Sequence, residues 1–94
     1  IQEAVDICKE VGNEEIILLK CTSAYPASLE DANLSMILGL SKRFGVISGF
    51  SDHTLGIVAP VVAVSLGAKV IEKHFILDKS IGGADAAFSL DYNE

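Results

Sequence analysis

Apolar side chains along this chain alternate between two kinds of spacing. Residues 1–11 carry them at helical spacing and are followed by a Gly-Asn stop. Residues 16–22 form a nearly continuous apolar run, which is typical of a strand buried on both faces. The same helix-then-strand order occurs twice more. The predicted helices span residues 1–11, 28–44 and 57–66, and the predicted strands span residues 16–22, 46–50 and 69–75.

Local signals refine these boundaries. Ser28, with Asp31 three residues later, predicts an N-terminal cap for the second helix. Pro60 fits the first turn of the third helix, and Gly67 fits its end. Residues 51–56 are expected to form a polar loop, and residues 77–94 are expected to be loop-like.

Strands that alternate with helices predict an α/β fold with a parallel sheet built by right-handed crossovers. Three strands cannot close a barrel, and an apolar sheet edge would stay open. We therefore interpret residues 1–94 as one partial domain of a larger protein, roughly three of the eight units of a (β/α)8 barrel of ~250 residues. An open Rossmann-like sheet is the alternative, although no strand is followed by a Gly-x-Gly-x-x-Gly segment.

This interpretation makes specific predictions of packing. The three strands should be adjacent and parallel in chain order. Four side chains should be buried between the strands and in the barrel interior, and two should lie under the helices. The first set is Ile17, Leu19, Ile47 and Val70, and the second is Ile71 and Phe75.

Composition excludes several classes of protein. Half of the 94 residues are hydrophobic, which rules out a disordered chain. No apolar run approaches the ~18 residues of a membrane span. The net charge of −6 argues against nucleic acid and anionic membranes as partners. Two cysteines without metal-ligand spacing favour a reducing compartment, so we expect a cytoplasmic protein in which both cysteines belong to the core.

Polar side chains follow the carboxyl end of each predicted strand, where parallel α/β folds place their active sites. Both histidines of the chain, His53 and His74, lie there on consecutive strands. Adjacent strands are ~4.8 Å apart. If His74 and Glu72 point inward, two imidazoles could share one ion at ~2.1 Å per bond.

The residues near the histidines also have ordinary structural interpretations. Tyr25 could anchor a loop, and Asp52 could cap the following helix or accept backbone amides. Glu72 and Lys73 could form ion pairs with neighbouring elements. The two histidines could themselves be hydrogen-bonded structural residues.

Three segments together resemble the sialic acid synthases. The first resembles that family's sixth barrel strand, the second its Gly-x-Ser-Asp-His-Thr segment, and the third its Gly-Ala-x-x-x-Glu-Lys-His-Phe eighth strand. They occur in the same order and cover most of the chain. The segments are residues 20–26 (KCTSAYP), 49–54 (GFSDHT) and 67–75 (GAKVIEKHF).

The resemblance implies a transferase with a (β/α)8 barrel, of which this chain is about strands 6–8. It implies condensation of phosphoenolpyruvate with an open-chain N-acetylated amino sugar, giving a nonulosonic acid and phosphate. It also implies a divalent metal, Mn²⁺ or Mg²⁺, a homodimer as the full-length protein, and barrel strands and a C-terminal antifreeze-like domain outside residues 1–94. The implied metal ligands are His53 and His74, the implied catalytic residues are Tyr25 and Asp85, and the implied substrate-binding residues are Ser23, Tyr25, Ser51, Asp85 and Phe88.

Residues 82–90 (GGADAAFSL) resemble the pseudaminic acid branch of that family. The N-acetylneuraminate branch typically has Gly-Pro-Asp-His there, and Asn where this chain has Ser23. Ala84 departs from the proline of the pseudaminic branch. Two other interpretations stay open: a non-catalytic half-barrel that dimerises through its sheet edges, and another barrel enzyme that uses phosphoenolpyruvate in aldol-type chemistry.

Overall fold

The computed structural model describes all 94 residues and places three parallel strands side by side in the order β1-β2-β3. This confirms the predicted parallel sheet and its strand order. No helix has the length and apolar character needed to cross a membrane. The elements are α1 (Gln2–Glu10), β1 (Ile17–Cys21), a 3-10 turn η1 (Glu30–Ala32), α2 (Met36–Phe44), β2 (Ile47–Asp52), α3 (Val58–Ser65), β3 (Ile71–Lys73) and a second 3-10 turn η2 (Lys79–Ile81).

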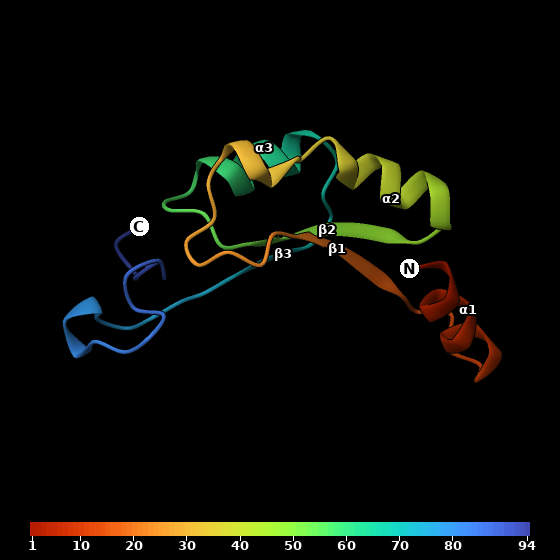
Figure 1. Cartoon of the computed structure of the whole chain (residues 1–94), viewed down its shortest axis with the longest axis horizontal. Coiled ribbons are helices and arrows are strands. Elements are labelled where there is room, and N and C mark those ends of the chain that lie inside the picture. The colour runs from red at the N-terminus through yellow and green to blue at the C-terminus, as the bar shows by residue number, and fades with distance from the viewer.

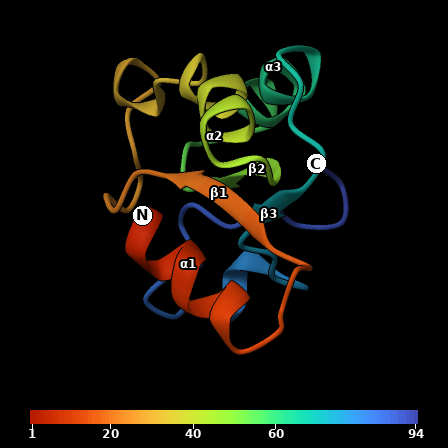
Figure 2. The same ribbon diagram turned by 90° about the vertical axis from the view of Figure 1, so that its right-hand side faces the viewer.

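The helices cover the sheet unevenly. Figure 1 shows α2 and α3 over the same face of the sheet, with α3 nearer the tail, and we call this face the helix face. Figure 2 shows α1 below the sheet, near the end where β1 begins. The other face, which we call the open face, carries no helix along the length of the strands.

The core lies between β2 and the two helices above it. Phe50 points from β2 into this layer and is almost fully buried. Ala59 and Ala63 occupy the side of α3 that meets the sheet, and their small side chains let the helix approach Phe50 closely. Ile37 of α2 completes the layer and has no exposed surface.

The strand register divides the side chains between the two faces. Leu19 pairs with Gly49, and Ser51 pairs with Glu72. Because side chains alternate along a strand, these residues share the open face, whereas Phe50 and Asp52 share the helix face. The predicted inward phase of Ser51 and Glu72 is confirmed by a hydrogen bond of 2.7 Å between their side chains.

The predicted burial is wrong for several apolar side chains. Ile17 and Ile47, paired on the open face, are 48% and 51% exposed. Ile71 is exposed at the edge of the sheet beside α3, and Phe75 is more exposed still. The physical reason is that no layer of this chain covers the open face or the β3 edge, so these side chains have nothing to pack against. Leu19 and Val70 are half-buried.

Two strand boundaries also differ from the prediction. β2 runs through Asp52, so the first two residues of the expected polar loop are buried in the sheet. β3 is shorter than expected because the chain beyond Lys73 changes its partner: Leu90 donates to the His74 carbonyl, and Ile76 donates to Leu90. The tail therefore replaces β2 as the neighbour of residues 74–76.

Two smaller expectations are corrected as well. Ser28 does not cap α2, which begins only at Met36. Its hydroxyl donates to the Asp31 carboxylate at 2.8 Å and accepts the Asp31 amide at 3.3 Å, and the turn that follows is η1. The cysteines are not core residues: Cys8 is half-buried, and Cys21 is exposed on the open face.

We expect the 94-residue chain on its own to self-associate, because its open face leaves branched apolar side chains in water. Sedimentation velocity measures this. The double variant Ile17→Thr/Ile47→Thr should reduce association, since it removes apolar area from the open face, whereas Leu77→Thr in the tail is the matched exposed control. A monomer with a sharp cooperative thermal transition would contradict the expectation.

Candidate active site

The carboxyl ends of β2 and β3 bring the two histidines together. The ring centroids of His53 and His74 are 5.4 Å apart, with the rings steeply inclined to each other. They line a hollow of about 230 Å³ together with Ser51, Glu72 and Lys73. The predicted meeting of His53 and His74 at neighbouring strand ends is thus found in the structure.

His53 is held by the main chain of the residue that directly follows β1. Its Nδ1 lies 2.9 Å from the carbonyl oxygen of Thr22. Because a carbonyl can only accept, Nδ1 donates, and the lone pair of the neutral ring is then on Nε2. Cys21 Sγ lies 4.0 Å from the same Nδ1, so the thiol borders the ring on the open face.

His74 is half-buried and is placed by the tail. Its Nδ1 lies 3.6 Å from Asp85 Oδ2, and its backbone carbonyl accepts from the Leu90 amide. Asp85 is largely exposed. The carboxylate therefore has room for a second polar partner while it faces the imidazole.

Tyr25 and Phe88 close an aromatic wall around the histidines. The Tyr25 ring stacks on His53 with 4.2 Å between centroids and a tilt of 39°. Phe88 is buried, and its centroid lies 5.6 Å from Tyr25 and 5.1 Å from His74. The four rings thus form one cluster. Tyr25 comes from the loop after β1, the two histidines from the ends of β2 and β3, and Phe88 from the tail.

Glu72 is a site residue that we did not assign from the sequence. It shares the hollow with both histidines and accepts a hydrogen bond from the Ser51 hydroxyl at 2.7 Å. The available signal was its phase, because Glu72 stands two residues before His74 on the same strand. Ser51 lies in the hollow as predicted. Ser23 is exposed in the loop after β1, and its side chain makes no hydrogen bond within the chain.

Asp52 and Lys73 form a buried ion pair, with 2.7 Å between Lys73 Nζ and Asp52 Oδ2. Asp52 Oδ1 also accepts the Thr54 amide at 2.8 Å. Both observations confirm the structural interpretation of Asp52 as an acceptor of backbone amides and of Lys73 as a partner in an ion pair.

The tail is tied back on itself beyond the aromatic wall. Lys79 Nζ and the Asp91 amide bond the Glu94 carboxylate, and these bonds lower the pKa of Glu94 below its usual range. Hydrogen bonds from Ser80 likewise lower the pKa of Asp78. Both carboxylates therefore favour the ionised form, and their hydrogen bonds stabilise the local structure of the segment that carries Asp85 and Phe88.

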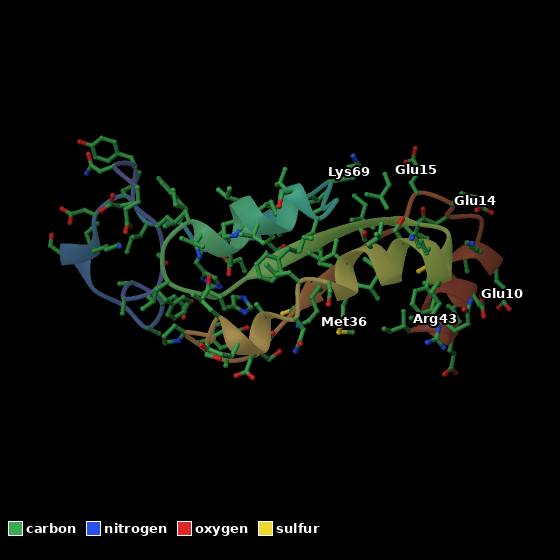
Figure 3. The ribbon with its side chains drawn as sticks, turned by 90° about the horizontal axis from the view of Figure 1, so that it is seen from above. Glu10, Glu14, Glu15, Met36, Arg43 and Lys69 are labelled. Atoms are coloured by element: carbon green, nitrogen blue, oxygen red, sulfur yellow. The ribbon has the colours of Figure 1, made fainter.

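The opposite end of the molecule has a different character. A larger hollow of about 1000 Å³ lies where the strands begin, between β1, β2 and α2, and contains no histidine or cysteine. Figure 3 shows charged side chains gathered at this end, far from the tail. The labelled charged residues at that end are Glu10, Glu14, Glu15 and Arg43.

The donor set at the histidines fits a divalent transition metal better than Mg²⁺. Imidazole nitrogens suit transition metals, whereas Mg²⁺ prefers oxygen ligands throughout. No group of three or more histidine, cysteine or carboxylate side chains is arranged to hold an ion. The chain thus offers two imidazoles, and an ion held there would keep several positions for water or substrate oxygens.

The chain is similar to known proteins over nearly its whole length. The model of the NeuB family matches residues 1–94. The chain is 53% identical to the pseudaminic acid synthase of Helicobacter pylori over 93 residues, which is 99% of this chain and 27% of that protein. It is 57% identical to the pseudaminic acid synthase of Campylobacter jejuni (strain 81-176) over 89 residues, which is 95% of this chain and 26% of that protein.

A solved structure shares the fold. The N-acetylneuraminic acid synthetase of Leptospira borgpetersenii, crystallised in complex with citrate, superimposes with a TM-score of 0.91 at 42% identity. The match covers 97% of this chain and 32% of that one. The chain spans about a quarter of the length of the curated relatives that it matches.

Proposed function

The chain belongs to the NeuB family, and on that premise we propose that it supplies part of the active site of a synthase that condenses phosphoenolpyruvate with an open-chain N-acetylated amino sugar. The products are a nonulosonic acid and phosphate. The observation that carries this proposal is the pair of inclined imidazoles, 5.4 Å apart, behind a wall of two aromatic rings at the carboxyl ends of parallel strands.

We place β1, β2 and β3 as about strands 6–8 of a (β/α)8 barrel. Two observations support the placement. The chain spans about a quarter of the length of its relatives, and its open face carries the exposed Ile17 and Ile47 where a barrel interior would be filled by side chains from other strands. The carboxyl ends of these strands then face the mouth of the barrel.

His53 and His74 are the proposed metal ligands, through the ring nitrogens that the protein leaves free. The Thr22 carbonyl orients the first ring, and Asp85 faces Nδ1 of the second. When bound, a divalent ion would act as a Lewis acid that polarises the aldehyde of the sugar. Outer hydrogen bonds such as the one between His53 and the Thr22 carbonyl orient metal-binding histidines in many proteins.

The remaining residues of the site have roles that follow from their chemistry. Tyr25 is exposed and presents a flat apolar surface that would bound the sugar chain, and the buried Phe88 packs against it. Asp85 is exposed enough to accept a hydrogen bond from a sugar hydroxyl or amide, and such charge-assisted bonds are strong. Ser51 and Glu72 form a polar edge beside the histidines. The Ser51 hydroxyl could receive a phosphate or carboxylate oxygen of phosphoenolpyruvate by turning its one hydrogen from Glu72 to the substrate.

We expect the product of the complete reading frame to prefer a 6-deoxy-diacetamido hexose of the altrose type over N-acetylmannosamine. The resemblance of residues 82–90 to the pseudaminic acid branch motivates this choice. The ratio should be about tenfold or more, which one well-placed hydrogen bond of roughly 1.5 kcal/mol provides. Phosphate release and the mass of the nonulosonic acid, measured with each sugar, check the prediction.

The two possible failures have different meanings. Faster turnover of N-acetylmannosamine would overturn the assignment of the sugar and leave the reaction class standing. Absence of phosphate release with either sugar, from folded protein supplied with Mn²⁺, would overturn the condensation itself.

A further inference from the structure

The residue before each histidine belongs to one buried ion pair on the helix face. Asp52 precedes His53, and Lys73 precedes His74. The side chains of Asp52 and Lys73 are 0% and 8% exposed, and their charged atoms are 2.7 Å apart. Because side chains alternate along a strand, this pair points toward the helix face while the two imidazoles point toward the open face, and Lys73 also borders the hollow that the imidazoles line.

A third residue completes the arrangement. Lys73 Nζ donates to the Thr54 carbonyl at 2.6 Å, and the Thr54 amide donates to Asp52 Oδ1 at 2.8 Å. Both polar backbone groups of Thr54 are thereby fixed. Asp52 and Thr54 flank His53 on its two sides, so the backbone that carries this ring is held before it and after it. We call Asp52, Lys73 and Thr54 the clamp.

The clamp is also the last link between β2 and β3. Their register ends at the pair Asp52 and Lys73. Beyond it the His53 carbonyl accepts from the Ala27 amide, and the His74 carbonyl accepts from the Leu90 amide. The two histidines are therefore bonded to different neighbours, and no ladder hydrogen bond between β2 and β3 sets the distance between them.

From these contacts we infer that the clamp is a positioning device that sets the separation and inclination of the His53 and His74 rings. The charged atoms of Asp52 and Lys73 and both backbone groups of Thr54 are used within the clamp, and only the buried Thr54 hydroxyl has no partner. The clamp therefore acts through the histidines. A buried ion pair is costly to desolvate and is weak support for stability by itself. A role in placing the two rings gives a reason for its position directly behind them. The consequence for metal binding rests on the proposed function, but the consequence for ring geometry does not.

The test uses the product of the complete reading frame. It distinguishes a role of the clamp in placing the two rings from a role in stabilising the fold. The single variant Lys73→Met leaves the Asp52 carboxylate buried without its partner and should destabilise the fold strongly. The double variant Asp52→Asn/Lys73→Met removes both charges with little change of volume, which is often neutral for stability. Ile37→Ala is the matched control, because it opens a cavity in the core without touching the clamp.

Two measurements are made on each folded variant. The first is the nuclear Overhauser contact between the His53 and His74 ring protons in metal-free protein. The second is the dissociation constant for Mn²⁺ by electron paramagnetic resonance. We expect the double variant to lose the ring contact and to bind Mn²⁺ about tenfold more weakly or worse, whereas Ile37→Ala keeps both at the wild-type values despite its lower stability.

Each alternative outcome has a single meaning. A double variant with the wild-type ring contact and Mn²⁺ affinity would overturn the positioning role. Equal losses in the double variant and in Ile37→Ala would also overturn it, because they would report general stability. If the wild-type protein did not bind Mn²⁺, the metal part of the proposed function would fail, and the ring contact in metal-free protein would still decide on the clamp.

Discussion

Replacing either histidine by alanine, in the product of the complete reading frame, is expected to abolish metal-dependent turnover, with a loss of more than about a hundredfold. The reason is that each variant removes one of only two imidazoles that the chain offers to an ion. A Lewis acid at a reacting carbonyl contributes several kcal/mol, and each 1.4 kcal/mol is tenfold in rate. His53→Gln and His74→Gln should fail as well, because an amide is the poorer ligand.

Activity measured against Mn²⁺ concentration distinguishes this expectation from a purely structural role. Lys42→Ala, an exposed change on α2 away from the hollow, serves as the control and should leave the activation curve unchanged. If the histidines were structural, the alanine variants would lose stability while the remaining folded enzyme kept its dependence on Mn²⁺. Unchanged metal activation in both variants would remove the metal-site assignment.

The second large effect is expected at Gly49, where Ala should lower the free energy of unfolding by roughly 2–4 kcal/mol. A Cβ on Gly49 would overlap the Val70 backbone carbonyl and come within 2.7 Å of Leu19 Cδ2. The carbonyl cannot retreat freely, because it accepts the Phe50 amide at 2.9 Å. Overpacking costs about 1–3 kcal/mol, and a disturbed hydrogen bond adds about 1 kcal/mol.

Gly39→Ala in α2 is the matched control, because a Cβ there meets no other atom within 4 Å. Alanine at this helical position should raise stability by about 1 kcal/mol. Urea unfolding of the product of the complete reading frame measures both changes. A Gly49→Ala protein as stable as the wild type would show that β2 and β3 can separate at no cost, which would contradict the packing described above.

The alternation of the hydrophobic pattern was enough to predict the parallel sheet and its order, because strands and helices bury side chains with different periods. It was also enough to predict that His53 and His74 meet, since parallel strands end at one edge. It failed for Ile17 and Ile47. A pattern shows that a side chain is apolar, but burial depends on what covers it, and the chain itself supplies no layer over that face.

The finer parts of the site depend on contacts that sequence spacing does not encode. The pairing of residues 74–76 with Leu90 arises from the return of the tail. The bond between Ser51 and Glu72 and the pair of Asp52 and Lys73 depend on a register that only the folded sheet fixes. Motif reasoning singles out the histidines, Asp85 and the polar pair Asp52 and Lys73, but it did not predict that the Thr22 carbonyl orients His53.

The carbonyl that orients His53 has a consequence for mutational studies. The Thr22 hydroxyl serves the loop, since it accepts from Lys20 and donates to the Asp31 carbonyl, while the imidazole is bonded by the main chain of the same residue. Every amino acid has that carbonyl. A side-chain scan, or a comparison of residue types among relatives, would therefore report position 22 as a loop residue and leave its influence on the ring unseen. Only a change to the backbone itself or to the path of the loop would reveal it.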